Sequence, residues 1–335
     1  MKKLIRILII LSLIPGIQPV LCQVNLNKTA QSTMNFLLVG TSSRAAAMGE
    51  AYTSTGVGSE SIFYNPAGLA VTNNSFDVNL NYTQWIADIN YLSGGVSWNL
   101  NEYGVIGVHL LTVDYGTING TSIVTDEISY PLGYRDDGPI SNVGAYSVGL
   151  SYAKSISEEF SIGGTVKLAG QNLGISVLTN GNKNNNANKL VFDAGVLYET
   201  GFKGFAFGMT IRNFATDIKR EEIEEQLPLI FSLGASIHLM EIISPEISQD
   251  NSILLSADFL HQNNYSERLN LGLEYKFLQM ISLRGGYQTN RDLASWSGGI
   301  GFTTTFSDYN LELNYSYSRF EFFDSVSRIS FIFSF

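Results

Sequence analysis

Residues 268–277, Arg-Leu-Asn-Leu-Gly-Leu-Glu-Tyr-Lys-Phe, alternate strictly between polar or small side chains and large apolar ones. Every second position from Leu269 to Phe277 carries Leu, Tyr or Phe. Because successive side chains of a β-strand point to opposite faces, this stretch predicts a strand with one apolar and one polar face. An α-helix repeats every 3.6 residues and would scatter the same side chains around its axis.

The same two-residue period recurs along most of the chain. The predicted polar faces carry mainly Ser, Asn, Gly and Thr, whereas the exposed faces of a soluble sheet usually carry many Lys and Glu. Only 15% of the chain is charged, against about 25% in ordinary soluble domains. We predict fourteen strands, over residues 76–83, 89–101, 104–116, 142–154, 159–171, 189–200, 203–213, 228–240, 252–261, 267–277, 280–289, 295–306, 309–320 and 325–335.

The connections between these segments differ in length. An even strand number, short turns at one end and longer loops at the other are typical of bacterial outer-membrane barrels. We predict an all-β fold, a 14-stranded antiparallel transmembrane barrel that spans residues 75–335, with apolar rows toward lipid and polar rows toward a wet lumen. The alternative is a soluble β-sandwich or periplasmic β-domain. Short connections are predicted at residues 101–104, 155–158, 199–203, 278–279 and 306–309, and longer ones at 117–141, 173–188, 214–227 and 240–251.

Composition excludes several other classes of protein. The chain of 335 residues has 44% hydrophobic residues and a single cysteine, which excludes a disordered chain and a disulfide-rich module. After the N-terminus, no apolar run reaches the ~20 residues of a membrane-spanning helix. Aromatic side chains near strand ends, among them Trp85, Trp98 and Trp296, are predicted to lie at the membrane interfaces.

The first 22 residues have the pattern of a secretory signal peptide. Lys2, Lys3 and Arg6 precede an apolar stretch over residues 7–14, too short for an uncleaved membrane anchor. A lipid-modified Cys22 is the weaker interpretation, because proline precedes it at position 19. Cleavage removes three of 20 basic residues and leaves 17 against 30 acidic ones, a net charge of −13. This charge disfavours nucleic acid as a partner and, with the barrel, predicts export to the outer membrane.

Residues 23–74 lack the strand rhythm and are predicted to form a plug inside the lumen, which fourteen strands would leave wide. Residues 42–49, Ser-Ser-Arg-Ala-Ala-Ala-Met-Gly, favour a short helix capped by Ser42. We expect Arg44 to pair with a lumen carboxylate and so hold the plug; alternatively, it faces the periplasm. The predicted plug motif comprises Arg44, Met48, Gly49, Asn65, Pro66, Ala67 and Gly68.

The inward-pointing positions predict a mostly polar lumen, lined by Lys167, Asp193, Arg212, Asp258, Arg268, Glu274, Arg284 and Glu312. The last strand ends in an alternating aromatic row that resembles the signal read by the barrel assembly machinery, namely Phe331, Phe333 and Phe335. The three histidines have no partners at metal or triad spacing. We therefore predict no catalytic site, no metal and no cofactor, and hence no enzyme.

The motifs between residues 36 and 70 resemble the N-terminus of the PorV/PorQ family of outer-membrane barrels, found in Bacteroidetes and related phyla. More distantly, they are similar to FadL-type fatty-acid transporters, whose plug carries an Asn-Pro-Ala turn. Both groups have the strand number counted above. The resemblance rests on Phe36-Leu37, Gly40, Arg44, Ala47-Met48-Gly49 and Ala51, and then on Phe63-Tyr64-Asn65-Pro66-Ala67-Gly68-Leu69-Ala70.

The resemblance implies one of two functions. As a PorV/PorQ relative, the chain would be a component of type IX secretion that contacts secreted cargo or a translocon. As a FadL-like channel, it would pass a small hydrophobic ligand through a plug that shifts. Because a fatty-acid tunnel needs a largely apolar lining, the polar lumen favours the protein-export function.

Overall fold

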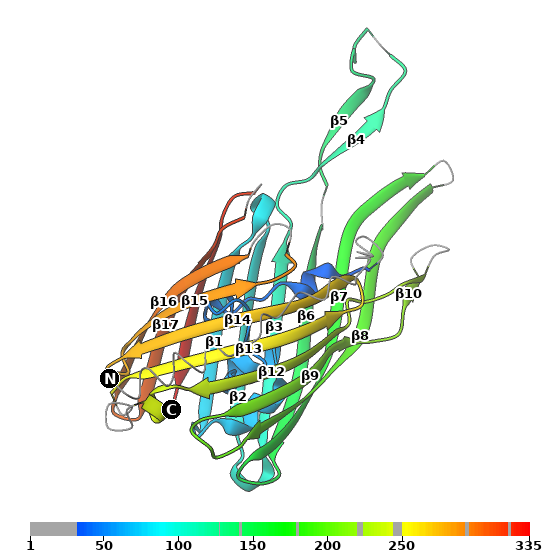
Figure 1. Cartoon of the computed structure of the whole chain (residues 1–335). Coiled ribbons are helices and arrows are strands. Elements are labelled where there is room, and N and C mark those ends of the chain that lie inside the picture. The colour runs from blue at the N-terminus through cyan, green and yellow to red at the C-terminus, as the bar shows by residue number, and fades with distance from the viewer. Residues whose placement is uncertain are drawn as a thin grey trace.

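The computed structural model describes residues 32–126, 128–140, 143–178, 181–219, 224–243, 250–291, 295–320 and 323–335. The signal peptide expected over residues 1–22 lies outside these ranges. Four short helices come first, followed by a closed antiparallel barrel in which β1 pairs with β18 (Figure 1).

Each of the fourteen predicted segments corresponds to one barrel strand, so the predicted fold class is confirmed. The barrel strands are β1 (Phe76–Gln84), β2 (Asn90–Asn99), β3 (Val105–Asp114), β6 (Val143–Ser155), β7 (Phe160–Leu178), β8 (Gly181–Glu199), β9 (Ala206–Phe214), β12 (Ile230–His238), β13 (Ser252–Gln262), β14 (Tyr265–Phe277), β15 (Ile281–Gln288), β16 (Trp296–Phe306), β17 (Tyr309–Ser318) and β18 (Val326–Ser334).

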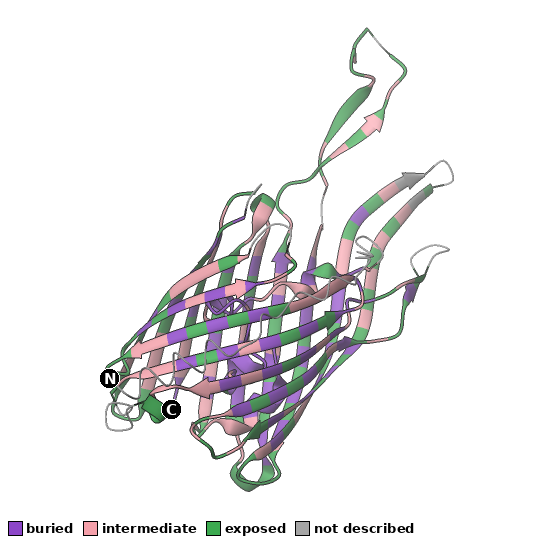
Figure 2. Ribbon diagram, in the orientation of Figure 1, coloured by how far each residue is buried: buried purple, intermediate pink, exposed green. Residues whose placement is uncertain are grey.

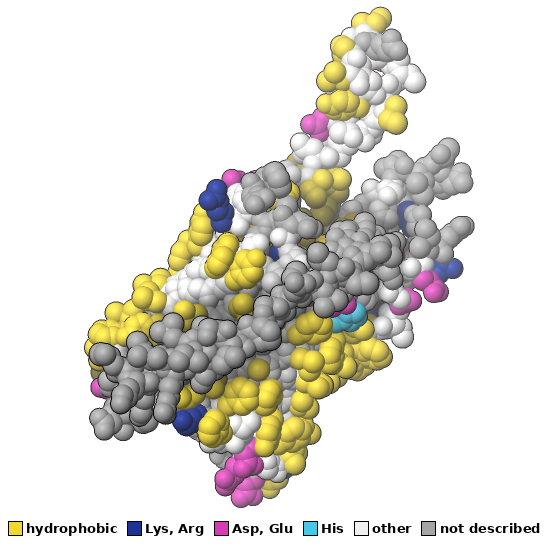
Figure 3. Space-filling model, viewed as in Figure 1, with side chains coloured by type: hydrophobic (Ala, Val, Ile, Leu, Met, Phe, Trp, Pro, Cys, Tyr) yellow, Lys and Arg dark blue, Asp and Glu magenta, His cyan; other side chains and the backbone are white. Residues whose placement is uncertain are grey.

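Buried and exposed residues alternate along the barrel strands (Figure 2), and polar residues make up most of the buried rows. In β1, Asn79 and Asn81 are 0% and 1% exposed, whereas Leu80 and Tyr82 are 54% and 47% exposed. A soluble sandwich would bury these apolar rows, so that alternative is wrong. The arrangement suits a wall with lipid outside and a polar interior, and apolar side chains cover much of the outer surface (Figure 3).

The barrel closes through its C-terminal strand. Leu80 of β1 lies opposite Phe331 of β18, and Phe76 and Phe335 exchange two backbone hydrogen bonds of 2.9 Å. The outward row of this strand contains Phe331 and Phe335, both exposed, and the half-buried Phe333. Its recognition by the assembly machinery stays a prediction.

Three connections predicted as loops contain strands. A hairpin of β4 (Asn119–Ile123) and β5 (Tyr134–Pro139) rises from the barrel, and β7 and β8 run on past the wall into the segment 173–188. The loop predictions were wrong because both faces of these extensions meet water, so their sequence lacks apolar alternation; backbone pairing alone makes them strands. A further small pair comprises β10 (Ile218–Lys219) and β11 (Glu224–Glu225).

The connections at the two ends of the barrel only partly follow the predicted asymmetry. At the end opposite the C-terminus, β1–β2 and β13–β14 are joined by short turns as well. The turns include the short helices η4 (Ile86–Asp88) and η5 (Asn101–Tyr103), and α3 (Met240–Ile243) follows β12.

Of the predicted interfacial tryptophans, Trp98 and Trp296 are exposed, but Trp85 packs instead against Tyr91 and Phe320.

Residues 32–75, which we call the plug, lie within the barrel (Figure 1). The plug contains η1 (Asn35–Leu38), α2 (Ser43–Ala47), η2 (Gly58–Phe63) and η3 (Pro66–Val71). The Ser42 hydroxyl accepts a hydrogen bond of 3.1 Å from the Ala45 N–H, which caps α2 as predicted. Helix α2 lies against β15–β18 and η3 against β3 and β6–β8. Within the described ranges, no helix has the length and apolarity needed to cross a membrane.

Candidate functional site

The guanidinium group of Arg44, in α2, meets the carboxylate of Glu274, in β14. Nε and Nη2 of Arg44 donate to Oε2 and Oε1 of Glu274, each over 2.9 Å. The two side chains are 18% and 7% exposed, so solvent screens their attraction little. Such a bidentate pair fixes orientation as well as charge, and its partner is a lumen carboxylate of the kind expected for Arg44.

Arg284, in β15, approaches the same carboxylate from the barrel wall. Its Nε lies 2.5 Å from Glu274 Oε2, and its Nη2 donates to Glu312 Oε1 over 3.3 Å. Asn314 bridges both, since it accepts from Arg284 and donates to Glu312. Two arginines and two glutamates thus form one balanced network, the condition under which buried charges are tolerated.

Two further lumen carboxylates bind plug backbone. Asp258 Oδ2, in β13, accepts from the N–H groups of Tyr52 and Thr53 over 2.9 and 2.8 Å. Asp77 Oδ1, in β1, accepts from the backbone N–H of Ser59 over 2.8 Å and also from its hydroxyl. Asp77 was missed as a site residue, although its place on the polar face of the first predicted strand was a usable signal.

The Asn-Pro turn joins plug and wall through an uncharged side chain. Nδ2 of Asn65 donates to Thr53 O over 2.8 Å and to Val196 O, in β8, over 3.0 Å. Its Oδ1 accepts from the Ala67 N–H over 3.2 Å and so caps η3, which begins at Pro66. One amide side chain therefore ties two plug segments to the barrel.

Wall glycines let this turn approach the strands. A Cβ atom at Gly195 would stand 2.0 Å from Asn65 Oδ1, and one at Gly163 would stand 2.4 Å from the carbonyl carbon of Pro66. Gly68 is required inside the plug itself, because its Cβ would stand 2.1 Å from Gly56 O. Contacts of this kind lie far inside ordinary van der Waals distances.

The Met48-Gly49 turn docks on the opposite wall in a similar way. Gly49 has a φ of 65°, which favours glycine, and its carbonyl accepts from Gln288 Nε2 over 3.0 Å. A Cβ at Gly286 would stand 2.0 Å from Gly49 N, and one at Gly272 would stand 2.7 Å from the Met48 carbonyl oxygen. Six of the seven predicted plug-motif residues therefore contact the wall, and Gly68 packs within the plug.

The remaining predicted lumen residues differ in the kind of contact they make: Lys167, Asp193 and Arg212 make polar contacts, and Arg268 lies against an aromatic ring. Lys167 Nζ pairs with Asp193 Oδ2 over 2.6 Å, and Arg212 Nη1 donates to the plug carbonyl of Phe63 over 2.7 Å. Arg268 does not join the plug contacts described above; its guanidinium carbon lies 4.7 Å from the centre of the Tyr265 ring.

Glu60, in η2, is a fully buried plug acid. Tyr52 Oη donates to its Oε2 over 3.0 Å. Burial, and next the negative charge of Glu312, raises the pKa of Glu60 to about 7. Glu60 therefore changes charge near neutral pH. Among the described residues, no cluster of three His, Cys, Asp or Glu could hold a metal ion.

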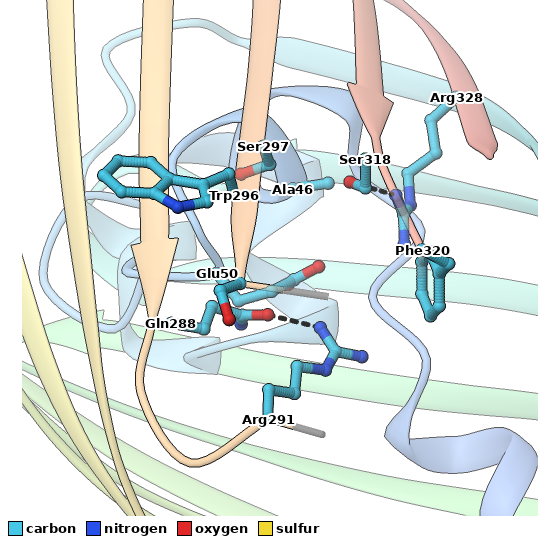
Figure 4. Close-up of a pocket in the computed structure, with 10 residues that line it drawn as sticks. Ala46, Glu50, Gln288, Arg291, Trp296, Ser297, Ser318, Phe320 and Arg328 are labelled. Carbon is cyan, nitrogen blue, oxygen red and sulfur yellow. Dashed lines mark hydrogen bonds between the residues drawn. The ribbon is translucent and has the colours of Figure 1, made fainter. Parts of the chain in front are cut away.

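A small pocket lies where the plug meets β15–β18, near the end opposite the C-terminus (Figure 4). Arg291 Nη1 donates to Gln288 Oε1, and Arg328 donates to Gly40 O over 3.0 Å and to Ser318 Oγ over 3.4 Å. Neither arginine was predicted as a site residue, since Arg291 lies in a connection and Arg328 in the C-terminal strand. The pocket is lined by Ala46, Glu50, Gln288, Arg291, Ser295, Trp296, Ser297, Ser318, Phe320 and Arg328.

Solved structures with a similar fold are transporters of aromatic hydrocarbons. The toluene transporter TbuX of Ralstonia pickettii has a TM-score of 0.56 and 13% identity, over 89% of this chain and 98% of TbuX. The toluene transporter TodX of Pseudomonas putida has a TM-score of 0.55 and 13% identity, over 88% of this chain and 97% of TodX. The monoaromatic hydrocarbon channel CymD has a TM-score of 0.55 and 13% identity, over 89% and 97%. These likenesses show a FadL-like outer-membrane fold.

A search of curated proteins finds no match. The family described as "Type IX secretion system protein PorV" matches residues 23–261, more than half of the chain and the whole described plug. This chain is therefore an outer-membrane β-barrel that belongs to the PorV family of type IX secretion system proteins.

Proposed function

We propose that this barrel is a non-enzymatic component of type IX secretion that contacts secreted cargo through the β4–β5 hairpin. Family membership supports a role in type IX secretion. The exposed hairpin is the observation that supports contact with cargo. Long loops of outer-membrane barrels lie on the extracellular side, so we place the hairpin outside the cell.

The hairpin exposes apolar side chains to water. Ile123, Ile128 and Leu132 are 93%, 94% and 77% exposed, and apolar side chains gather at its tip (Figure 3). Exposed apolar groups beyond the membrane are costly in water and mark surfaces that bind protein. Within the described ranges β4 pairs with β5 alone, so each strand also offers a free backbone edge for an extended peptide.

The plug supports a role other than the free passage of solutes through the lumen. It is attached to the wall through a balanced charge network, two carboxylate–backbone contacts and glycine contacts on both walls. A cavity beside the plug at Phe63 and Tyr64 has only about 40 Å³ and is lined partly by Lys167 and Asp193. An uncharged hydrocarbon would gain little from such a lining.

Site-specific photo-crosslinking in living cells tests the proposal. A photoreactive residue at Ile123 should crosslink to secreted proteins, whereas one at Tyr103, also exposed but at the other end of the barrel, should not. Replacing Ile123, Ile128 and Leu132 together by serine should reduce cargo co-purification about tenfold, without changing the amount of folded barrel. Recovery of lipid alone at Ile123, with cargo unaffected by the serine variant, would contradict the proposal.

A FadL-like channel is the second candidate. It is supported by the fold shared with TbuX, TodX and CymD, and by a cavity of about 430 Å³ that lies between plug residues 54–57 and the wall. Uptake of radiolabelled toluene into liposomes containing the barrel separates the two. Uptake above that of empty liposomes favours the channel, and none favours the export role.

A further inference from the structure

Arg291 and Arg328, like Arg212, have neutral hydrogen-bond partners and so differ from Arg44 and Arg284. Arg44 and Arg284 each contact a carboxylate, but among the described residues no carboxylate oxygen lies within 4.0 Å of Arg291 or Arg328. Their hydrogen-bond partners are neutral, namely an amide, a hydroxyl and a backbone carbonyl. These hydrogen bonds engage Nε and Nη1 of Arg328 and Nη1 of Arg291.

Aromatic rings hold the faces of the two guanidinium groups. Arg328 lies over Trp85 with its central carbon 5.4 Å from the ring centre, and Arg291 lies over Phe320 at 5.9 Å. The Trp85 and Phe320 rings pack edge to face at 5.5 Å. Because the faces are covered, the planar edges remain to bind a ligand, and these edges match oxyanions.

Among the described residues that line the pocket, Glu50 is the one acidic residue (Figure 4). Its carboxylate abuts Gly40, since a Cβ atom there would collide with both oxygens, and it makes no direct contact with either arginine. Burial, and next the charge of Arg268, lowers the pKa of Arg291 to about 10 even though Glu50 opposes the change. Two arginines against one glutamate leave positive charge in excess among the described lining residues.

We propose that Arg291 and Arg328 bind a small oxyanion group, a carboxylate or a phosphate, presented from the extracellular end of the barrel. Arg328 lies near the start of β18 and Arg291 follows β15, so both are far from the C-terminal end. The pocket has room for about one water-sized group. One oxygen of the ligand occupies that space and accepts from both guanidinium edges, while the rest of the ligand stays outside.

The test uses the full-length mature barrel, purified in detergent, and its tryptophan fluorescence, since Trp85 and Trp296 adjoin the site. Sodium phosphate, sodium acetate and sodium chloride are titrated at constant ionic strength. Phosphate, acetate or both should give a saturable change; the tighter of the two identifies the source, and chloride should be at least tenfold weaker.

Four variants distinguish a binding site from a structural role. R291Q and R328Q should each weaken oxyanion binding about tenfold or more, as loss of a charged hydrogen bond does. E50Q should tighten binding several-fold, because it removes the opposing charge. R319Q, an exposed arginine at the same end of the barrel, is the matched control and should bind as the parent does.

Circular dichroism and heat-modifiable gel mobility check that each variant is folded. If R328Q does not fold, R291Q and E50Q decide alone. No saturable oxyanion binding, equal binding of chloride, unchanged affinity in R291Q or weaker binding in E50Q would each overturn the proposal.

Discussion

The two sides of the plug are held to the barrel by different chemistry. Helix α2 is held to β14 by the charges of Arg44 and Glu274, a carboxylate that Arg284 of β15 shares, in addition to the glycine contacts of the Met48-Gly49 turn. The Asn-Pro turn is held to β7 and β8 by a neutral amide and by close contact with two glycines. The charged side depends on every partner being present, whereas the neutral side depends on shape and on single hydrogen bonds. Substitutions on the two sides should therefore weaken the attachment of the plug to the wall in different ways.

Removing Glu274 should have the largest effect. E274A leaves Arg44 and Arg284 facing each other without their shared carboxylate, and we expect a loss of about 3–5 kcal/mol in unfolding free energy. Urea titration of the barrel in detergent, followed by fluorescence, measures this loss. Arg135 and Asp137 form an exposed pair with the same 2.9 Å distance, so D137A is the matched control and should cost less than about 1 kcal/mol. Equal losses in E274A and D137A would show that burial of the charged pair is unimportant.

Glu60 should give the charged side a dependence on pH. The folded plug raises the pKa of Glu60 to about 7, whereas an unfolded glutamate titrates near 4.3. Between these values the folded state holds a proton that the unfolded state has released, so stability falls as pH rises through this window, by at most about 4 kcal/mol. E60Q should flatten the curve of urea midpoint against pH from 5 to 8. A parent barrel that gained stability over that range, or an E60Q curve as steep as the parent's, would contradict this assignment.

Asn65 should show a smaller loss on the neutral side. N65A removes the donor to Thr53 and Val196 and the cap of η3, with an expected cost of about 1–2 kcal/mol. N65D keeps the acceptor that caps Ala67 but not the donor, so it separates the two contributions. The N65A cost should be nearly independent of salt, measured as urea midpoints at low and high sodium chloride, because this substitution changes no charge. A strong salt dependence of the N65A loss would mean that charge also acts on this side.

How much could be read from the sequence differs from element to element. All fourteen barrel strands followed from alternation, because lipid on one face and a polar interior on the other force opposite side-chain types at successive positions. Ser42 as a helix cap followed from local chemistry. The β4–β5 hairpin and the extensions of β7 and β8 were predicted as loops, because strands with water on both faces carry no alternation.

The candidate site was partly foreseeable. The inward positions of Glu274, Arg284 and Asp258 followed from strand register. That Glu274 is the carboxylate that meets Arg44 could not be inferred, since the two are 230 residues apart. The pocket of Arg291 and Arg328 was missed for the same reason, because its residues come from the plug and from connections and strand ends at one rim of the barrel.

The order of polar and apolar residues by itself determined an inside-out barrel with an irregular segment before it, because strand periodicity is a local property. Tertiary structure alone decided which wall residues the plug touches, which charges are balanced and which arginines have neutral partners. These depend on strand register and on barrel closure, which bring together side chains that the chain order keeps far apart.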